Sequence, residues 1–245
     1  MRIPRIYHPE PLRDHDQIDL SDDGAGHVAR VLRLTTGHPI TLFCGDGYDY
    51  HGEILELTKR SVSVQINTRE DQHHLESPLN IHLGQVMSRG DKMDFTIQKS
   101  VELGVIAITP LLSERCGVKL DEKRLEKKRQ QWQKVVVSAC EQCGRAVVPI
   151  VHEVISLEQW SAQPTPALKL NLHPKAPYTI KSMPTPTHGI RLLIGPEGGL
   201  SDDEINRCSI LAFSEIQLGP RILRTETAAL TAISALQCQF GDLAQ

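Results

Sequence analysis

Several signals that often reveal the chemistry of a protein are missing from this chain of 245 residues. It contains neither G-x-x-x-x-G-K-[ST] nor G-x-G-x-x-G, so loops for nucleoside triphosphates and dinucleotides have no support. Its 27 Lys and Arg are outnumbered by 30 Asp and Glu, which excludes the global positive field of a sequence-indifferent nucleic-acid binder. Aromatic residues make up only 4%, which argues against a stacking platform for long single strands. Any contact with RNA must therefore be local.

Long apolar runs and an organised set of cysteines are also missing. No run approaches the ~20 apolar residues of a membrane span, and the N-terminus lacks the apolar core of a signal peptide. The six cysteines are scattered without a framework, as expected of reduced thiols in the cytoplasm. Cys140 and Cys143 form a C-x-x-C within a helical pattern, but no second pair accompanies them. Packing explains them better than zinc or redox chemistry, and we expect no bound metal.

The strongest positive signal is a pair of glycine-containing segments, each directly after a short apolar run. Residues 195–199 (GPEGG) follow the run 192–194, and residues 218–227 (LGPRILRTET) follow the segment 215–218. Ligands of open α/β sheets bind where strands end, and glycine lets the backbone approach a ligand closely. The pair therefore predicts a ligand site. Tight strand-to-helix turns without a ligand are the alternative.

The charge of the first segment narrows the class of ligand. Glu197 lies at its centre, where a carboxylate would repel a polyphosphate. A neutral or cationic ligand fits better. An adenosine that carries a sulfonium would suit, because backbone groups can hydrogen-bond its base and its positive sulfur is compatible with nearby carboxylates.

Beyond residue 78, strands and helices alternate, which predicts a parallel sheet covered by helices. A capping box, Ser201 with Glu204, marks one helix start directly behind the first glycine segment. The expected strands are 79–87, 105–109, 148–154, 167–172, 190–194 and 215–218. The expected helices are 91–103, 121–143, one from Ser201 and one from Thr225.

The first 70 residues or so have the pattern of a small β-rich unit. Gly45-Asp46-Gly47 separates two strand patterns and predicts a hairpin, and residues 61–66 alternate like a half-buried strand. Residues 26–34 have helical periodicity, which places Val28, Val31 and Leu32 inward and leaves Arg30 and Arg33 to project. A polar stretch, 71–78, is the expected linker.

Several long motifs in order carry a family resemblance over the whole chain. Residues 195–199 and 218–228, with 90–94 (GDKMD), 102–105 (ELGV) and 141–142 (EQ), closely resemble the bacterial small-subunit rRNA methyltransferase E family of the SPOUT superfamily. Cys143 departs from the serine expected in most relatives. The resemblance implies an α/β fold in which a PUA-like β-barrel RNA-binding domain (1–72) precedes a trefoil-knotted, parallel-sheet methyltransferase domain (73–245). It also implies a homodimer that uses S-adenosylmethionine to methylate ring N3 of one uridine in 16S rRNA of the small ribosomal subunit.

The motifs nominate residues for each role. Arg221, Glu141 and Arg145 are the catalytic candidates, because an arginine can stabilise a uracil anion and a carboxylate can act as base. An i,i+4 ion pair is the alternative for Glu141 and Arg145. The cofactor-binding candidates are Leu170, Leu172, His173, Ile194, Gly195, Glu197, Gly199, Ile216, Leu218, Gly219, Leu223 and Thr225. The RNA-binding candidates are Arg2, Arg5, Arg30, Arg33, Arg89, Lys92 and Lys99.

Two other functions stay open on the residues alone. One keeps the cofactor but methylates a ribose 2′-hydroxyl, and the other is a non-catalytic RNA-binding or ribosome-assembly factor.

Overall fold

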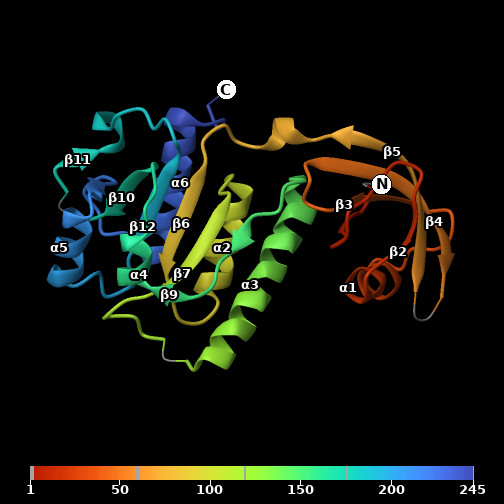
Figure 1. Cartoon of the computed structure of the whole chain (residues 1–245), viewed down its shortest axis with the longest axis horizontal. Helices are drawn as coiled ribbons and strands as arrows, with labels where there is room; N and C mark the ends of the chain where they lie inside the picture. The colour runs from red at the N-terminus through yellow and green to blue at the C-terminus, as the bar shows by residue number, and fades with distance from the viewer. Residues whose placement is uncertain (1–2, 59–60, 119, 175, 245) are drawn as a thin grey trace. The chain divides into compact units, whose positions relative to one another are not determined.

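The chain forms two compact units. The computed structural model describes residues 3–58, 61–118, 120–174 and 176–244. The first unit comprises Met1–Glu76 with Cys140–Val148, and the second comprises Ser77–Ala139 with Pro149–Gln245 (Figure 1). The first unit thus includes a short segment, 140–148, that the predicted division at residue 72 does not contain. The assignment of the two ranges to RNA binding and catalysis remains a prediction.

The first unit is built on a five-stranded sheet in the order β1-β3-β4-β5-β2. The predicted hairpin is confirmed: β3 and β4 pair antiparallel, and Gly45 and Gly47 between them have φ of +94° and +89°. The strands are β1 (Arg5–Tyr7), β2 (Gln17–Asp19), β3 (Pro39–Phe43), β4 (Tyr48–Leu57) and β5 (Val62–Asp71). The helical segments are α1 (Asp22–Gly26), the π-helix η1 (His27–Val31) and the 3₁₀-helix η2 (His73–Leu75).

The predicted inner face of the 26–34 helix is only partly right. Val28 is fully buried, but Val31 is 66% exposed and Leu32 36% exposed, so the inward placement of these two is wrong. The helix begins earlier, at Asp22, and changes to a π-helix after Gly26. A π-helix has more residues per turn than an α-helix, so a 3.6-residue period assigns its last positions to the wrong face.

The second unit confirms the predicted parallel sheet covered by helices. Its strands lie in the order β11-β13-β10-β12-β6-β7-β8, with β9 also paired to β7, and every one of these pairings is parallel. The strands are β6 (Ile81–Val86), β7 (Ala107–Leu112), β8 (Ile150–Val151), β9 (Ile155–Ser156), β10 (Leu168–Leu172), β11 (Tyr178–Thr179), β12 (Ile190–Ile194) and β13 (Ser214–Gln217). The helices are α2 (Lys92–Glu102), α3 (Glu122–Cys143), α4 (Leu157–Ala162), α5 (Asp202–Ile210), α6 (Thr225–Phe240) and the 3₁₀-helix η3 (Ile180–Ser182).

Side chains on both faces explain why the central strands are so apolar. All five residues of β12 are buried, as expected for a strand with helices on each side. Leu193 packs with Trp160 of α4 and Cys208 of α5, whereas α2 and α6 pack on one another (Figure 1). The guanidinium of the buried Arg191 lies 4.2 Å from the centre of the Trp160 ring. This cation–π contact offsets part of the cost of removing the charge from water.

The order of strands decides where the ligand site can be. β12 lies between β10 and β6, and β13 lies on the other side of β10, so the loops after β10, β12 and β13 leave neighbouring strands at one edge. The capping box predicted at Ser201 is present, with the Ser201 side chain accepting from the Glu204 backbone. The short helix α4 was not predicted. The trefoil knot remains a prediction.

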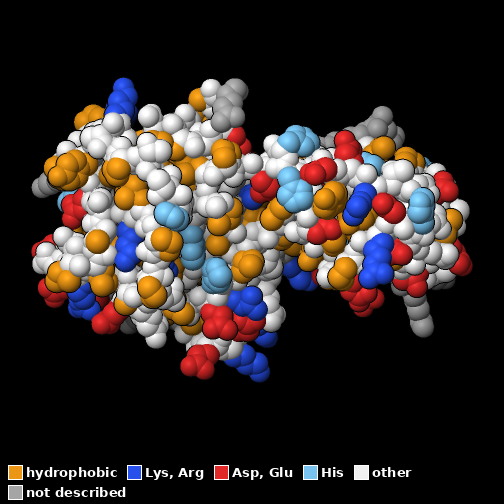
Figure 2. Space-filling view, turned by 45° about the horizontal axis from the view of Figure 1, so that its top comes forward, with side chains coloured by type: hydrophobic (Ala, Val, Ile, Leu, Met, Phe, Trp, Pro, Cys, Tyr) orange, Lys and Arg blue, Asp and Glu red, His pale blue; other side chains and the backbone are white. Residues whose placement is uncertain are grey.

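The surface agrees with the near-neutral composition. In the space-filling view, acidic and basic side chains are interspersed on the visible face, without a field of one sign (Figure 2). Among the described residues, no helix is both long enough and apolar enough to cross a membrane.

Candidate functional site

A cavity of about 600 Å³ lies where β10, β12 and β13 end. Its walls come from the loops that follow these strands and from the first turns of α2 and α6. The predicted cofactor residues that line it are Leu172, His173, Ile194, Gly195, Glu197, Gly199, Ile216, Leu218, Gly219, Leu223 and Thr225. The two glycine segments, separated by 18 residues in the chain, therefore border a single cavity.

The remaining predicted cofactor residue, Leu170, lies deeper in the sheet. It is fully buried two residues before the end of β10, and the structure places it in the core instead of the cavity wall. The cavity also has lining residues that the sequence did not nominate for the cofactor: Lys92, Asn171, Pro174, Pro196, Leu200, Ile205, Arg221, Ile222, Arg224 and Ala228. Most of them adjoin the glycine motifs, and that proximity is the only signal in the sequence that could have found them.

Glycine is required at two points of the wall. Gly199 has φ of +69° and Gly219 has φ of +73°, a region that other residues enter at a cost. A Cβ built on either would meet no protein atom within 4 Å. The backbone therefore borders open space at both positions, and a ligand can approach it closely.

Charges of both signs surround the mouth of the cavity. Lys92 Nζ lies 3.2 Å from Glu197 Oε1 and 3.9 Å from Glu226 Oε2. Arg221 and Arg224 line the same cavity and are exposed. A site with paired acids and bases suits a zwitterionic ligand better than a polyphosphate. The position of Glu197 had predicted a neutral or cationic ligand in place of a polyphosphate.

One of the residues that line the cavity has a buried polar group without a protein partner. Asn171 lines the cavity, is 1% exposed, and its Oδ1 has no hydrogen-bond partner among the described residues. A buried amide without a partner is costly, so a ligand that donates a hydrogen bond there would stabilise the site. Adenine and an α-ammonium group are both such donors. The cavity, its glycine walls and Asn171 together fit S-adenosylmethionine.

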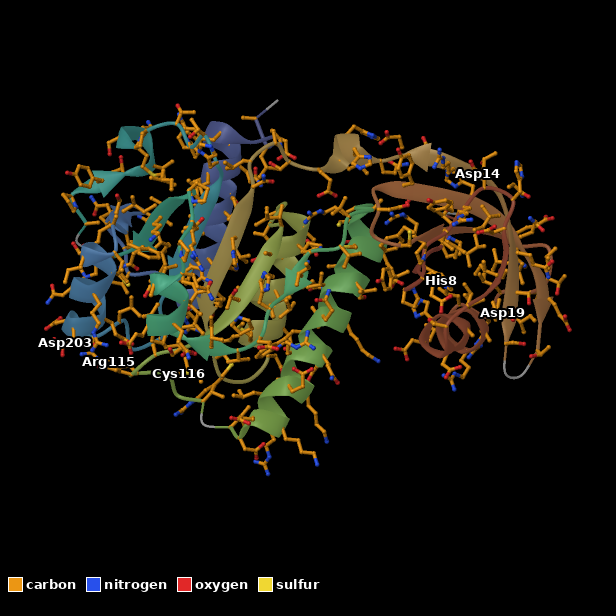
Figure 3. All side chains as sticks on the ribbon, in the orientation of Figure 1. His8, Asp14, Asp19, Arg115, Cys116 and Asp203 are labelled. Atoms are coloured by element: carbon orange, nitrogen blue, oxygen red, sulfur yellow. The ribbon has the colours of Figure 1, made fainter. Side chains whose placement is uncertain are left out.

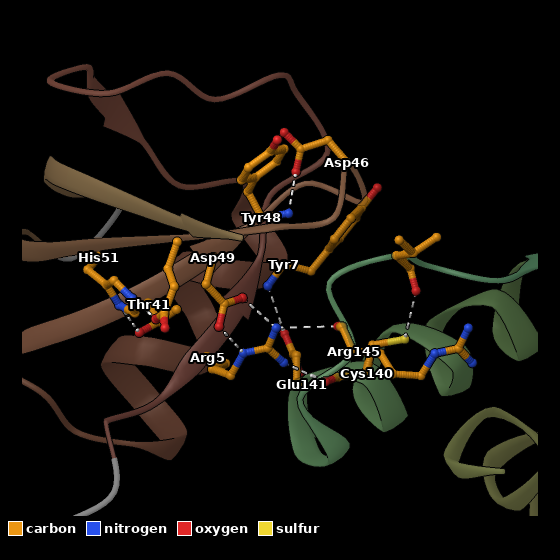
Figure 4. A network of polar contacts seen from close by, with 12 residues as sticks. Arg5, Tyr7, Thr41, Asp46, Tyr48, Asp49, His51, Cys140, Glu141 and Arg145 are labelled. Atoms are coloured by element: carbon orange, nitrogen blue, oxygen red, sulfur yellow. Dashed lines mark hydrogen bonds and ion pairs between the residues drawn. The ribbon is translucent and has the colours of Figure 1, made fainter. Parts of the chain in front are cut away.

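The three catalytic candidates belong to different units. Arg221 lines the cavity, whereas Glu141 and Arg145 belong to the first unit. Glu141 Oε1 accepts from the Tyr7 backbone N–H at 3.1 Å (Figure 4). Arg145 pairs with Glu76 and is 4% exposed. Both side chains join residues distant in sequence within the first unit.

The RNA-binding candidates are also divided between the two units. The Arg5 side chain is only 8% exposed: it pairs with Asp49 at 2.6 Å and donates to the Cys140 carbonyl at 2.6 Å (Figure 4). Lys99 pairs with Glu102 at 2.7 Å. The exposed candidates are Arg30, Arg33 and Arg89, Lys92 lies at the cavity, and Arg2 is outside the described residues.

The cysteines and histidines form no metal centre in the described part of the chain. No group of three or more His, Cys, Asp or Glu is arranged there to hold an ion. Cys140 and Cys143 are both free thiols, and burial raises the pKa of Cys140 to about 12, which keeps it protonated. Cys140 is therefore a packing residue.

Comparison with known proteins adds two domain matches. The RNA methyltransferase domain matches residues 75–237, and the RNA methyltransferase PUA domain matches residues 12–67. Ribosomal RNA small subunit methyltransferase E of Buchnera aphidicola (subsp. Schizaphis graminum) is 42% identical over 99% of this chain and 98% of its own length. The Bacillus subtilis protein of the same name is 30% identical over 94% of this chain and 93% of its own length.

Two solved structures are also similar over the full chain. The putative methyltransferase of Legionella pneumophila, in complex with the bound cofactor SAM, is 43% identical with a TM-score of 0.96. Ribosomal RNA small subunit methyltransferase E of Neisseria gonorrhoeae, bound to S-adenosyl methionine, is 40% identical with a TM-score of 0.91. Each alignment covers 99% of this chain and 100% of the other.

Proposed function

The chain belongs to the ribosomal RNA small subunit methyltransferase E family, and we propose that it methylates ring N3 of one uridine in 16S rRNA. It is an S-adenosylmethionine-dependent RNA methyltransferase with an N-terminal PUA domain. The uridine and its ring nitrogen are the part that we propose, and they rest on the motif resemblance described above.

The single structural observation that supports methyl transfer from S-adenosylmethionine is the cavity at the ends of β10, β12 and β13. It joins both glycine motifs, has backbone accessible at Gly199 and Gly219, and carries Arg221 at its wall. The cofactor supplies an activated methyl group on a cationic sulfur. The chain's own residues hold the two reactants in line, and such positioning is a major source of rate in a displacement reaction.

Arg221 is our candidate for the chemical step. When N3 loses its proton, negative charge spreads over the ring nitrogen and the flanking carbonyl oxygens. A planar, permanently charged guanidinium can donate two parallel hydrogen bonds to such an anion. Glu141 and Arg145 remain secondary candidates, because their contacts in the first unit already give both side chains a structural role.

We further propose that the first unit contacts rRNA through exposed basic side chains such as Arg30 and Arg33, within the assembled small subunit and in the cytoplasm. We also propose that the protein acts as a homodimer, as the resemblance implies. Both are independent of the cavity's chemistry.

Mapping the methylated nucleoside tests the function directly. 16S rRNA from a strain lacking the gene should lack one N3-methyluridine, and purified protein with S-adenosylmethionine should restore it on small subunits from that strain. Loss of a 2′-O-methyl group instead would identify a ribose acceptor. If wild-type protein binds no S-adenosylmethionine in calorimetry, the protein is a non-catalytic RNA-binding factor.

A further inference from the structure

An arginine that does not line the cavity donates hydrogen bonds to the backbone of the first glycine loop and of the residue after it. Arg115 lies on the loop that follows β7, shown with Cys116 in Figure 3. Its Nη1 donates to the carbonyl oxygens of Gly198 and Leu200, at 3.2 Å each. A Cβ added to Gly198 would lie 3.7 Å from the Arg115 Cβ, so the stem of the arginine runs alongside the loop.

The backbone that carries Arg115 is itself fixed. The Glu114 N–H donates to Glu204 Oε1 at 2.9 Å, and the other oxygen of this carboxylate accepts from the Ser201 N–H at 2.9 Å. Glu204 is 7% exposed, so these are shielded, charge-assisted bonds. On the other side, Arg89 Nε donates to the Gly117 carbonyl at 3.1 Å. Arg115 therefore projects from a loop tied to both α5 and the segment after β6.

The glycine loop needs such support because of its composition. Three of the five residues 195–199 are glycine, which gives the free chain many conformations and makes one fixed conformation entropically costly. Inside the cavity, Thr225 holds the Gly195 carbonyl and Lys92 pairs with Glu197. Without Arg115, the carbonyls of Gly198 and Leu200 would lose the contacts that fix the end of the loop.

We propose that Arg115 is a positioning residue that holds residues 198–200 in the conformation that receives S-adenosylmethionine. The inference rests on the proposed role of the cavity as the cofactor site. Arg115 acts through the loop and does not line the cavity, so its removal should weaken cofactor binding while leaving the chemical step intact once the cofactor is bound.

The exposure of Arg115 allows a different role, and the two are separable. A surface arginine that contacts an RNA phosphate would change the KM for the small subunit and the salt dependence of that KM. It would leave the cofactor Kd and the motion of the glycine loop unchanged. A positioning role predicts that the cofactor Kd and the motion of the glycine loop change, whereas the KM for the small subunit and its salt dependence do not.

The test compares Arg115→Ala with Arg207→Ala. Arg207 is also exposed, and among the described residues its ion pairs are with Glu114 and Glu158, each at 3.8 Å, and not with the glycine loop, so it is a matched control. Calorimetry gives the Kd for S-adenosylhomocysteine, and single-turnover methylation at saturating cofactor gives the rate of the chemical step. Hydrogen exchange of the ligand-free protein measures how well the backbone amides of residues 198–200 are protected against local opening.

Arg115→Ala should raise the Kd about tenfold, the equivalent of one net hydrogen bond to a charged group. Its saturated rate should stay within about twofold, and exchange should accelerate at 198–200 but not in α3. Arg207→Ala should match the wild type in all three. An unchanged Kd and unchanged exchange in Arg115→Ala would overturn the inference even if wild-type protein binds the cofactor. No binding by the wild type would instead remove the proposed function.

Discussion

The hydroxyl of Thr225 donates a hydrogen bond to the carbonyl oxygen of Gly195, at 2.8 Å. Thr225 is the first residue of α6 and Gly195 is the first residue after β12. The Thr225 hydroxyl in turn accepts from Gln85 Nε2, near the end of β6, at 3.0 Å. Hydrogen bonds among β6, α6 and the residue after β12, which are distant in the sequence, thus fix the orientation of the first peptide group of the glycine loop.

Thr225→Val tests this relationship, because valine keeps the shape of the side chain and removes the hydroxyl. The Gly195 carbonyl and the Gln85 amide would both lose a partner. We expect the Kd for S-adenosylmethionine to rise about tenfold or more, with about 1–3 kcal/mol lost from the free energy of unfolding. Calorimetry and urea unfolding measure the two effects. Thr225→Ser should restore most of the affinity, and Thr227→Val, at an exposed position of the same helix, should change neither quantity.

Gly219→Val should abolish cofactor binding while the protein stays folded. The added side chain would enter the cavity, where no protein atom lies within 4 Å of the new Cβ. Gly37→Val is the matched control: Gly37 also has a positive φ, +81°, and open space around a Cβ, but it lies in the first unit. Both variants should lose about 1–2 kcal/mol of stability from backbone strain. Only Gly219→Val should lose affinity in calorimetry, and equal affinities would mean that the segment is a turn without a ligand.

Arg221→Ala should lower the single-turnover rate of methylation by ~10²–10³-fold, the range for removing one preorganised donor to a developing anion. Cofactor affinity should fall by less. Arg221→Lys should not rescue the rate, because one ammonium cannot reproduce the two parallel bonds of a guanidinium. A variant that keeps its saturated rate and loses only affinity would make Arg221 a binding residue.

Acid should destabilise the second unit through His82. Burial, followed by the charges of His152 and Arg191, lowers the pKa of His82 from 6.5 to about 4. Between pH 4 and pH 6.5 the unfolded chain binds a proton at His82 that the folded chain does not. The free energy of unfolding that neutral His82 contributes is therefore present above pH 6.5 and is lost as the pH falls toward 4. We expect the free energy of unfolding to drop by about 1–2 kcal/mol between pH 7 and pH 5 from this group.

Urea unfolding at both pH values measures that drop. His82→Gln should reduce the difference between the two pH values, because the glutamine does not titrate. His188→Gln replaces an exposed histidine and should leave the difference unchanged. An unaltered pH dependence in His82→Gln would assign the acid lability to other groups.

The proposed homodimer predicts a molar mass near twice 27.3 kDa in light scattering at micromolar concentration. The alanines of α6 differ in their exposure: Ala229 and Ala232 are buried within the subunit, whereas Ala228 and Ala235 are half-buried. A monomer mass at micromolar concentration would contradict the proposal.

Much of the cavity could be predicted because its signals are local. Gly195 directly follows the buried strand β12, Gly219 lies two residues after β13, and a capping box at Ser201 fixes the helix behind the first of them. These patterns depend on neighbours in the chain, so the sequence alone determined the strand ends, the helix starts and the residues most suited to approach a ligand.

Only the tertiary structure decided which of these pieces meet. β12 pairs with both β10 and β6, and Arg115 reaches a loop more than 80 residues away, because parallel pairing and side-chain contacts join segments whose separation leaves no periodic trace. The same reason hid the ion pair of Arg145, which its place near a motif made a catalytic candidate and which the fold pairs with Glu76. Sequence determined the local conformations, whereas long-range packing chose the partners of each charged side chain.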